Sequence, residues 1–384
     1  MEAYLDNSAT TKCYEEVKDL VVKTLIEDFG NPSAMHLKGV EAEKYLKDAA
    51  AAIAATLKVQ EKEIFFTSGG TESDNWALAG TAYANCRQGK HIITTAFEHS
   101  AIAEPLRRLE EQGFEVTVIP VDHHGNLNLE KLEAAIRPDT ILVSTMMVNN
   151  EIGALVPVEE VAKIVHKANP KTYFHVDAIQ AYGKYRIYPK RMGIDMLSVS
   201  GHKIHGPKGI GFLYINEKVK IQPLLLGGGQ QKGMRSGTDN VPGISGLGKA
   251  AELVHQNQEE KVQKMRELKL YLAEELTSME QVEINGPLPE EGAPHILNVS
   301  FLGVRSEVLL HTLEEKQIYV SAGSACSSHK RAASASMTAI AADKEHRESA
   351  IRFSLCEFTT KEEIDYALNE IKTVLPMLRK YARH

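Results

Sequence analysis

The chain has 384 residues, more than one hydrophobic core usually serves, so we expect two domains within one protomer. Hydrophobic residues make up 43% and charged residues 25%, and the net charge is −7, which argues against a nucleic-acid-binding surface or a basic membrane anchor. We expect a cytoplasmic protein, because no leader-like segment opens the sequence and no window approaches about 18 continuous apolar residues. The four cysteines are widely spaced without a CxxC pair, so neither a disulfide framework nor a metal site is expected.

From about residue 40 to residue 215, apolar strand-like runs alternate with helical patterns. The expected strands are Ile64–Phe66, His91–Thr94, Glu115–Ile119, Thr140–Met146, Tyr173–Val176, Met196–Val199 and Gly211–Ile215. The expected helices include Val40–Leu57, Glu72–Asn85, Ile102–Glu111 and Val158–Ala168. This alternation predicts an α/β fold with a mostly parallel seven-stranded sheet covered on both faces, in which ligands bind at the carboxyl ends of strands.

The second half of the sequence predicts a smaller α+β unit. Val241–Met279 reads as one long helix rich in Glu, Lys and Leu, and a mixed pattern follows it. We therefore expect a large domain of residues 13–257 and a small domain of residues 1–12 and 258–384. The least regular stretch, residues 321–348, is rich in Ser, Ala and Gly before a charged run and predicts a mobile loop.

One lysine, Lys203, stands between two of the expected strands among small and polar residues. Asp177 ends another apolar run 26 residues earlier, so both side chains can lie at the ends of neighbouring strands. A pyridoxal cofactor needs a lysine for its aldehyde and a carboxylate at its ring nitrogen, because a protonated pyridinium draws electrons from the substrate carbon. Lys203 and Asp177 therefore predict a pyridoxal site.

The segment Thr67–Asp74 follows a strand and opens a helix, so its backbone N–H groups and the helix dipole could hold a phosphate. Taken alone, the pattern is a weak signal, and a turn in which Ser or Thr caps the helix is the favoured interpretation. Further donors near the lysine favour a phosphate site, and they are Thr71, Ser200, His202 and Thr238. A nucleotide P-loop is excluded because Gly209 occupies its Ser/Thr position, and no dinucleotide fingerprint precedes a helix.

Three polar residues in other segments could face such a cofactor. His99 stands just beyond a strand at a helix start, where it could stack on the ring and move protons or simply cap the helix. Asn150 follows another strand and could reach a substrate carboxylate, or it could be a turn residue. Arg352 breaks an apolar strand and could grip a carboxylate in bidentate fashion, or it could lie on an edge strand.

Cys326 is the candidate reactive thiol. It lies among Ser, Ala and Gly, which leave the thiol uncovered and make a poor setting for a buried cysteine. Accessibility is one of two requirements of a reactive thiolate, and the other is a lowered pKa. Cys13, Cys86 and Cys356 lie in helical or apolar contexts and are interpreted as packing or surface residues.

Ten motifs, in order along almost the whole chain, resemble those of NifS/IscS-type cysteine desulfurases, which are fold-type I pyridoxal phosphate enzymes of the class-V aminotransferase family. The motifs are Tyr4–Thr11, Gly30–Ser33, Thr67–Asn75, Glu98–His99, Val148–Gly153, His175–Gln180, Ser200–Lys203, Arg235–Thr238, Ser324–Cys326 and Ile351–Ser354. The fold that this resemblance implies has the same large sheet domain and smaller α+β domain.

The resemblance also implies a role for each matching residue. Lys203 would form the Schiff base with pyridoxal 5′-phosphate, Asp177 would pair with the ring nitrogen, and His99 would stack on the ring as acid and base. Gln180 would donate to the ring hydroxyl. The cofactor phosphate would be held by Gly70, Thr71, Ser200 and His202 of the same subunit, and Thr238 of the partner subunit would complete its site. A homodimer is therefore implied. Asn150 and Arg352 would bind the substrate carboxylate.

The implied reaction converts L-cysteine to L-alanine. Lys203 would take the α-proton, and the Cys326 thiolate would attack the substrate sulfur and keep it as a persulfide. The segment around Cys326 is similar to that of the long-loop group of the family. The sulfur acceptor that this implies is a protein of iron–sulfur cluster assembly or of tRNA thiolation. Ala332–Ser336 and Ala339–Asp343 lack the Pro and Gly that are common there, and Cys356–Glu357 replaces a Gly-containing pair.

Two other interpretations are open at this point. A selenocysteine lyase or an aminotransferase of the same fold would share Lys203 and Asp177, and Cys326 distinguishes the latter because transamination needs no thiol. A catalytically silent binding protein on this fold would bind no visible-absorbing cofactor.

Overall fold

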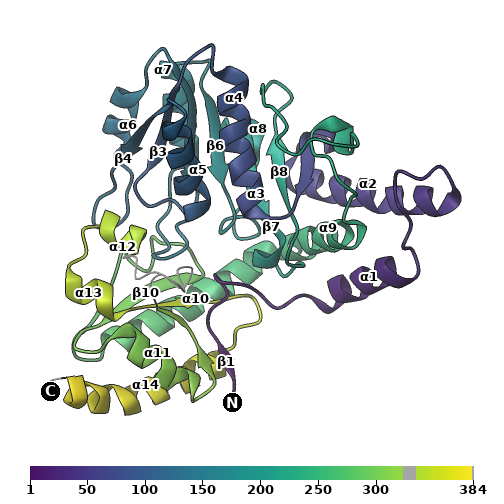
Figure 1. Ribbon diagram of the computed structural model, residues 1–384. Coiled ribbons are helices and arrows are strands. Elements are labelled where there is room, and N and C mark those ends of the chain that lie inside the picture. Colours follow the sequence, from purple (N-terminus) through teal and green to yellow (C-terminus); the bar gives the residue numbers. More distant parts are fainter. Residues whose placement is uncertain (323–333, 383–384) are drawn as a thin grey trace.

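The computed structural model describes residues 1–322 and 334–382, and its elements form two units with separate hydrophobic cores (Figure 1). The larger unit contains β2 (Ile64–Thr67), β3 (His91–Thr95), β4 (Glu115–Ile119), β5 (Thr140–Met146), β6 (Tyr173–Asp177), β7 (Met196–Ser200) and β8 (Gly211–Ile215). These strands form one sheet in the order β2–β8–β7–β6–β5–β3–β4. β8 is antiparallel to both of its neighbours and the other pairs are parallel, so the predicted mostly parallel seven-stranded sheet is confirmed.

Helices cover both faces of this sheet (Figure 1). One face packs against α3 (Gly70–Asn75), a π-helical turn (Trp76–Gly80), α4 (Thr81–Asn85) and α5 (Ser100–Glu111). The other face packs against α2 (Leu37–Leu57), α6 (Leu129–Ala135), α7 (Val158–Ala168), α8 (Pro189–Met192) and α9 (Val241–His255). Successive strand residues point to opposite faces, so Ile92 and Ile93 are both fully buried, each under a different layer. Burial on both faces explains why these strands read as nearly continuous apolar runs.

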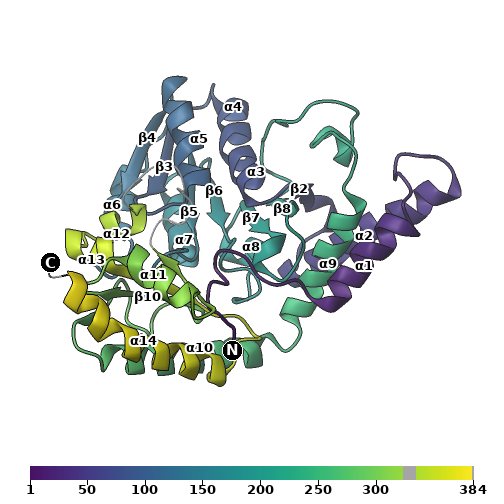
Figure 2. The same cartoon turned by 60° about the horizontal axis from the view of Figure 1, so that its bottom comes forward.

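The smaller unit is built on an antiparallel sheet in the order β12–β13–β10–β9. Its strands are β9 (Val282–Ile284), β10 (Ile296–Phe301), β12 (Ser321–Ala322) and β13 (Ala350–Ser354). Its main helices are α10 (Gln258–Thr277), α11 (Ser306–Glu314) and α14 (Lys361–Ala382), which gather around this sheet in Figure 2. The boundaries at residues 12 and 257 stay a prediction.

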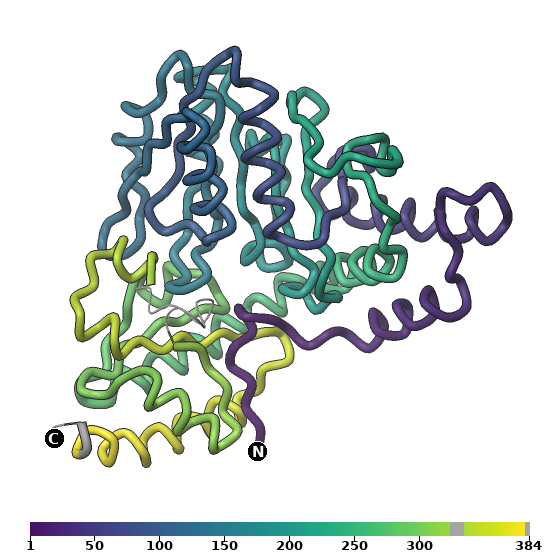
Figure 3. Tube along the Cα trace, viewed as in Figure 1, coloured from purple at the N-terminus to yellow at the C-terminus, as the bar shows by residue number. Residues whose placement is uncertain are grey.

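The N-terminal segment joins the two units. β1 (Ala3–Tyr4) pairs with β11 (Ile318–Tyr319) of the smaller unit, and the chain then runs towards the larger one, as Figure 3 traces. Thr11 N donates to the His202 carbonyl at 2.9 Å, just after β7, and α1 (Glu15–Ile26) then packs against α9. The chain between β1 and α1 therefore runs from the smaller unit to the turn after β7.

Two sequence predictions about the second half are wrong in part. The single helix expected over Val241–Met279 is two helices, because Asn257 adopts a left-handed conformation with φ of 51° that ends α9 and starts α10 in a new direction. The irregular stretch expected over residues 321–348 contains two short helices in its described part, α12 (Ala335–Ala339) and α13 (Lys344–Ser349). Ser334 and Asp343 cap their first turns, a local signal that the composition argument overlooked. None of the described helices combines the length and apolarity needed to cross a bilayer.

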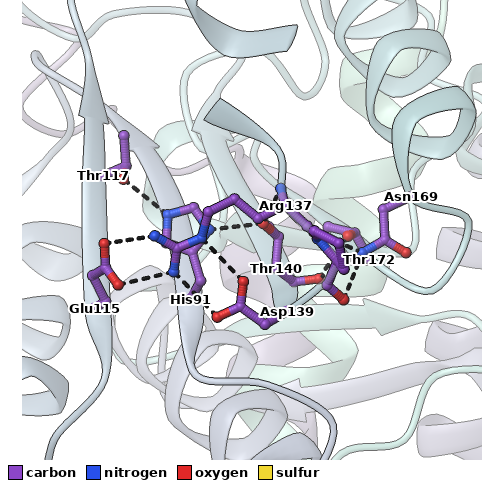
Figure 4. Close-up of polar contacts among 9 residues, drawn as sticks. His91, Glu115, Thr117, Arg137, Asp139, Thr140, Asn169 and Thr172 are labelled. Carbon is purple, nitrogen blue, oxygen red and sulfur yellow. Dashed lines mark hydrogen bonds and ion pairs between the residues drawn. The ribbon is translucent and has the colours of Figure 1, made fainter. Parts of the chain in front are cut away.

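A polar network connects the amino ends of β3, β4 and β5 (Figure 4). These strand ends lie opposite the carboxyl ends at which ligands are expected to bind. The buried His91 ring bonds Thr140 Oγ1 at 2.7 Å through Nδ1 and Thr117 Oγ1 at 2.8 Å through Nε2. Arg137 pairs with Glu115 at 2.7 and 2.8 Å, and its backbone N–H donates to Thr140 Oγ1 at 2.8 Å. The Thr140 hydroxyl therefore serves two buried or partly buried partners at once.

Thr140→Val tests this network, because valine keeps the shape and removes the hydroxyl. We expect the free energy of unfolding to fall by about 2 kcal/mol, since two polar groups lose a partner. Urea denaturation measures it, with Thr373→Val on an exposed helical face as the matched control, expected within about 0.5 kcal/mol of the parent. Equal losses in the two variants would show that the network does not stabilise the sheet.

Candidate active site

The candidate site lies at the carboxyl ends of β6 and β7, which are neighbours in the centre of the large sheet. Asp177 is the last residue of β6 and Ser200 the last of β7, and Lys203 ends the short 3₁₀ turn that follows β7. The backbone N–H of Ile179 donates to the Asp177 carboxylate at 2.9 Å and orients it. The structure therefore confirms that the lysine and the carboxylate lie at the ends of adjacent strands.

The N-terminal segment holds the lysine side chain. Lys203 Nζ donates to the carbonyl of Ser8 and, at 2.7 Å, to the carbonyl of Ala9. Gln180 Nε2 donates to the same Ser8 carbonyl at 3.0 Å, so Lys203 and Gln180 converge on one point. Sequence reasoning gave Ser8 and Ala9 no role, although the Tyr4–Thr11 motif that contains them was conspicuous.

Burial and the lysine charge set the ionisation of the neighbouring groups. Burial raises the pKa of Asp177 to about 6, while the Ile179 hydrogen bond and the charge of Lys203 act in the opposite direction. Burial, followed by the charge of Lys203, lowers the pKa of His99. His99 is therefore a neutral imidazole near pH 7, and since its Nδ1 accepts the Ala101 N–H at 3.1 Å, its proton is assigned to Nε2. The structure brings Lys203, Asp177 and His99 into one electrostatic group.

A glycine turn approaches the end of β7 from the other side. Gly69 has φ of 147°, and a Cβ on Gly70 would lie 2.2 Å from Ile179 Cδ1 and 3.6 Å from Ser200 Cβ. Glycine is favoured at position 69 because side chains rarely adopt this φ, and a side chain at position 70 would have to displace Ile179 Cδ1 where α3 begins. This contact brings the first turn of α3, with Thr71, next to Ser200. His202 is also close, with its Nδ1 3.1 Å from Thr10 Oγ1 and its pKa lowered to about 4, chiefly by burial.

Arg352 reaches the site from β13 of the smaller unit and is mostly buried, at 8% exposure. Its Nη2 pairs with Asp6 Oδ1 at 2.8 Å, and its Nη1 donates to the Asn150 carbonyl at 2.8 Å. Its Nε is buried with no hydrogen-bond partner among the described residues. Asp6 thus compensates the guanidinium charge, and a donor is left for an anionic group. The predicted pair Asn150 and Arg352 is in contact, although through the Asn150 backbone.

Two predicted residues are not brought into this group. Thr238 is exposed in the loop before α9, and the neighbouring Arg235 ties that loop to α3 by pairing with Glu72 at 2.9 and 3.1 Å. Cys326 lies outside the described residues. At the start of α12, Ser334 and Ser336 donate to the partly buried carboxylate of Glu151, the latter at 3.1 Å. Sequence reasoning missed Glu151 as a link between the Asn150 turn and the smaller unit.

The residues present fit a phosphorylated pyridoxal group. A carboxylate ends one strand, an amine follows the next, an imidazole caps a helix beside them, and a glycine turn with hydroxyl and imidazole donors forms the far wall. Arg352 Nε adds an unused buried donor for a carboxylate. Fold and site together define a fold-type I pyridoxal phosphate enzyme.

Comparisons with known proteins agree with this class. The family model for aminotransferase class-V matches residues 3–367. Among curated relatives, "Cysteine desulfurase IscS" of Methanosarcina thermophila is 44% identical over 376 residues, which cover 98% of this chain and 92% of that protein. "Putative cysteine desulfurase IscS 1" of Bacillus subtilis (strain 168) is 42% identical over 377 residues, covering 98% and 99%. A solved structure of a "NIFS-LIKE PROTEIN" has a TM-score of 0.93 and 40% identity, covering 98% and 100%.

The chain therefore belongs to the class-V aminotransferase family, in its branch of NifS- and IscS-type cysteine desulfurases. Members of this family depend on pyridoxal phosphate, which confirms the predicted cofactor.

Glu98, next to His99, makes the free energy of unfolding depend on pH. Burial raises its pKa to about 8, although Thr95 and the Met146 N–H donate to it. Between about pH 4.5 and 8 the carboxyl is protonated when folded and ionised when unfolded, so this group makes stability fall as pH rises. Glu98→Gln removes that effect, and we expect the variant's stability relative to the parent to increase from pH 5 to pH 8. Urea midpoints at several pH values measure it, with exposed Glu110→Gln as control; a constant difference would contradict the assignment.

Proposed function

We propose that this chain is a cysteine desulfurase that releases L-alanine from L-cysteine and passes the sulfur, as a persulfide on Cys326, to an acceptor protein. The observation that carries the proposal is Lys203 at the end of β7 beside Asp177 at the end of β6. The substrate class follows from the relatives named cysteine desulfurase, which this chain matches over nearly its full length.

The residues of the site divide into those that hold the cofactor and those that hold the substrate. When bound, pyridoxal phosphate withdraws electrons from the substrate α-carbon. Asp177 would keep a proton on the ring nitrogen, Gln180 would donate to the ring hydroxyl and His99 would cover the ring. The phosphate would be held by the backbone at Gly70 and by Thr71, Ser200 and His202. The substrate carboxylate is held by Arg352, with Nε as the unused donor, and by Asn150.

The reaction is carried by one amine, one imidazole and one thiolate. The Lys203 amine takes the α-proton of L-cysteine and returns a proton to the carbon skeleton. The Cys326 thiolate attacks Sγ, so a sulfur–sulfur bond forms, the Cβ–Sγ bond breaks and its electron pair stays with the carbon. Protonation of that carbon gives L-alanine. His99, neutral near pH 7, carries the protons that the sulfur transfer releases.

The activity test is incubation of the purified protein with L-cysteine and a reductant, with L-alanine and sulfide measured together. Equal yields are expected, because each turnover releases one of each. Alanine from L-selenocysteine but not from L-cysteine would instead identify a selenocysteine lyase. Absence of both products, without visible cofactor absorption, would leave the silent binding protein.

Cys326→Ala separates cofactor binding from sulfur transfer. The variant should keep the visible absorption of bound pyridoxal phosphate, because that depends on Lys203, and should lose alanine formation from L-cysteine by at least about a hundredfold, since the attacking nucleophile is gone. Cys86→Ala, which removes an exposed thiol, is the control and should retain full activity. Full alanine production by Cys326→Ala would exclude the thiol mechanism.

We also propose that the protein works as a homodimer. The end of α1, the start of α2 and the connection between them project from the body of the molecule and expose large apolar side chains (Figures 1 and 2). These are Val22, Leu25, Ile26, Phe29, Met35, Leu37 and Val40. Leu224, Leu225 and Leu226, in the segment that leads to Thr238, are also exposed. A patch of this extent supports a second copy as the occupant, and Thr238 of the partner subunit would then complete the phosphate site.

The double change Ile26→Asp and Phe29→Asp should give a monomer, because both side chains are about two-thirds exposed in the single chain, at 69% and 68%. Sedimentation velocity measures the mass, and bound pyridoxal phosphate should fall with it. Leu288→Asp, at 52% exposure on the smaller unit, is the control. A double variant that sediments like the parent would place the contact elsewhere.

The acceptor and the compartment are the finer parts of the proposal. We propose an iron–sulfur scaffold or a tRNA-thiolation protein as acceptor, since the Ser324–Cys326 motif is of the type associated with such partners, and the cytoplasm as the compartment. Transfer of labelled sulfur from the Cys326 persulfide to purified candidate acceptors tests the first, and cell fractionation tests the second.

A further inference from the structure

The segment between β8 and α9 is bonded to the chain on both sides of the turn that leads from β2 into α3. On the β2 side, Gln231 Nε2 donates to the Phe66 carbonyl at 2.9 Å, and Gln231 Oε1 accepts the Phe66 N–H at 2.7 Å. Phe66 lies on β2, which is the edge strand of the large sheet. The Gln231 amide therefore bonds to this edge as the backbone of a further strand would.

The conformation of this segment is unfavourable by itself. Gln231 and Lys232 have φ of 48° and 61°, in the left-handed region that residues with a side chain rarely adopt. Two such residues in a row persist where the surrounding contacts determine them. The Gln231 bonds to β2 are such contacts, and the Gly237 N–H adds another by donating to Gln230 Oε1 at 2.9 Å. The segment is therefore held in one shape, with Arg235 against the start of α3.

On the α3 side, Arg235 and the backbone of Ser68 meet at the carboxylate of Glu72. Arg235 donates in bidentate fashion, from Nε to Oε1 at 2.9 Å and from Nη2 to Oε2 at 3.1 Å. The Ser68 N–H donates to the same Oε2 at 2.8 Å. The side chains of Arg235 and Glu72 are 21% and 18% exposed, so water screens this ion pair less than a surface pair. One carboxylate therefore joins the segment after β8 to the first residue after β2.

The charge of Glu72 makes its surroundings important. Burial acts to raise the pKa of Glu72, but the hydrogen bonds from Arg235 and Ser68 outweigh burial and hold this pKa below its usual value. Glu72 is therefore ionised near pH 7, and it directly follows Thr71, which is proposed to hold the cofactor phosphate. A carboxylate without a partner at this position would repel a phosphate. Arg235 compensates that charge.

We propose that Arg235 is a positioning residue of the phosphate site: it compensates the charge of Glu72 and holds the Glu72 carboxylate on the Ser68 N–H, so that the turn accepts a phosphate. This inference rests on the proposed function, because it assumes that the phosphate of pyridoxal phosphate lies at Gly70 and Thr71. Arg235 acts through Glu72, with which both of its bonded nitrogens pair.

The test compares pyridoxal 5′-phosphate with pyridoxal, which lacks the phosphate. The full-length protein is freed of cofactor with hydroxylamine, and each compound is titrated back while the visible absorption of its complex is measured. Arg235→Ala should raise the Kd of pyridoxal 5′-phosphate by about tenfold, because the Glu72 charge loses its partner, and leave that of pyridoxal within about twofold. An equal rise for both compounds would mean a general loosening of the site, and no rise would mean no positioning. Either result overturns the proposal.

A second change tests whether Arg235 acts through Glu72. Glu72→Gln in the Arg235→Ala background removes the unpaired charge and keeps an oxygen for the Ser68 N–H, so the Kd of pyridoxal 5′-phosphate should return to within about threefold of the parent. No recovery would mean that Arg235 acts through the rest of its segment, which carries Thr238, and would overturn the proposal. If Arg235→Ala fails to fold, Arg235→Lys keeps the charge without the bidentate geometry. It should raise the same Kd by about threefold and leave that of pyridoxal unchanged.

Arg137→Ala is the matched control, because Arg137 pairs with Glu115 in the same bidentate geometry, at 2.7 and 2.8 Å, but at the amino end of β4. Both Kd values should stay within about twofold of the parent. A parent that binds neither compound would contradict the proposed function, and a parent that binds both equally would contradict its phosphate site. Unchanged Arg235 variants of a parent that prefers the phosphorylated compound would contradict the role of Arg235 alone.

Discussion

The attraction between the Lys203 ammonium and the buried Asp177 carboxylate is the interaction on which the rest of the site depends. A carboxyl at the dry end of a central strand is neutral unless a cation stands near it, and burial alone raises its pKa. Lys203 supplies that cation from the turn after the adjacent strand. The parallel arrangement of β6 and β7 makes the pairing possible, because both strands end at the same edge of the sheet.

The second constraint is that the site needs groups from both units. Arg352 lies on the sheet of the smaller unit, whereas Lys203 follows the large sheet. The N-terminal segment solves this by crossing between them: Asp6 pairs with Arg352, and the carbonyls of Ser8 and Ala9 hold the lysine. Because Asp6 and Ser8 are two residues apart, Arg352 and Lys203 are both held by one short segment of the chain. Displacement of either unit would therefore disturb both contacts together.

Much of the fold could be predicted from the sequence because the strands are apolar on both faces, and buried parallel strands leave a strong signal. The lysine and its carboxylate were also predictable, since each follows such a strand. The break at Asn257 was not, because a single left-handed residue inside a helical pattern leaves no trace in its periodicity. Ser8 escaped for a different reason: it acts through its backbone carbonyl, a group that every residue carries. The roles of all the site residues, Cys326 and Thr238 included, stay predictions.

The measurement that tests the central claim most directly is identification of the residue that bears the cofactor. Borohydride reduction of the purified protein fixes pyridoxal phosphate to its lysine, and peptide mass spectrometry then locates it. The account predicts a phosphopyridoxyl group on the peptide that contains Lys203. Its presence on another lysine, such as the partly buried Lys184, or the absence of any modified peptide from a protein that absorbs in the visible range, would contradict the account.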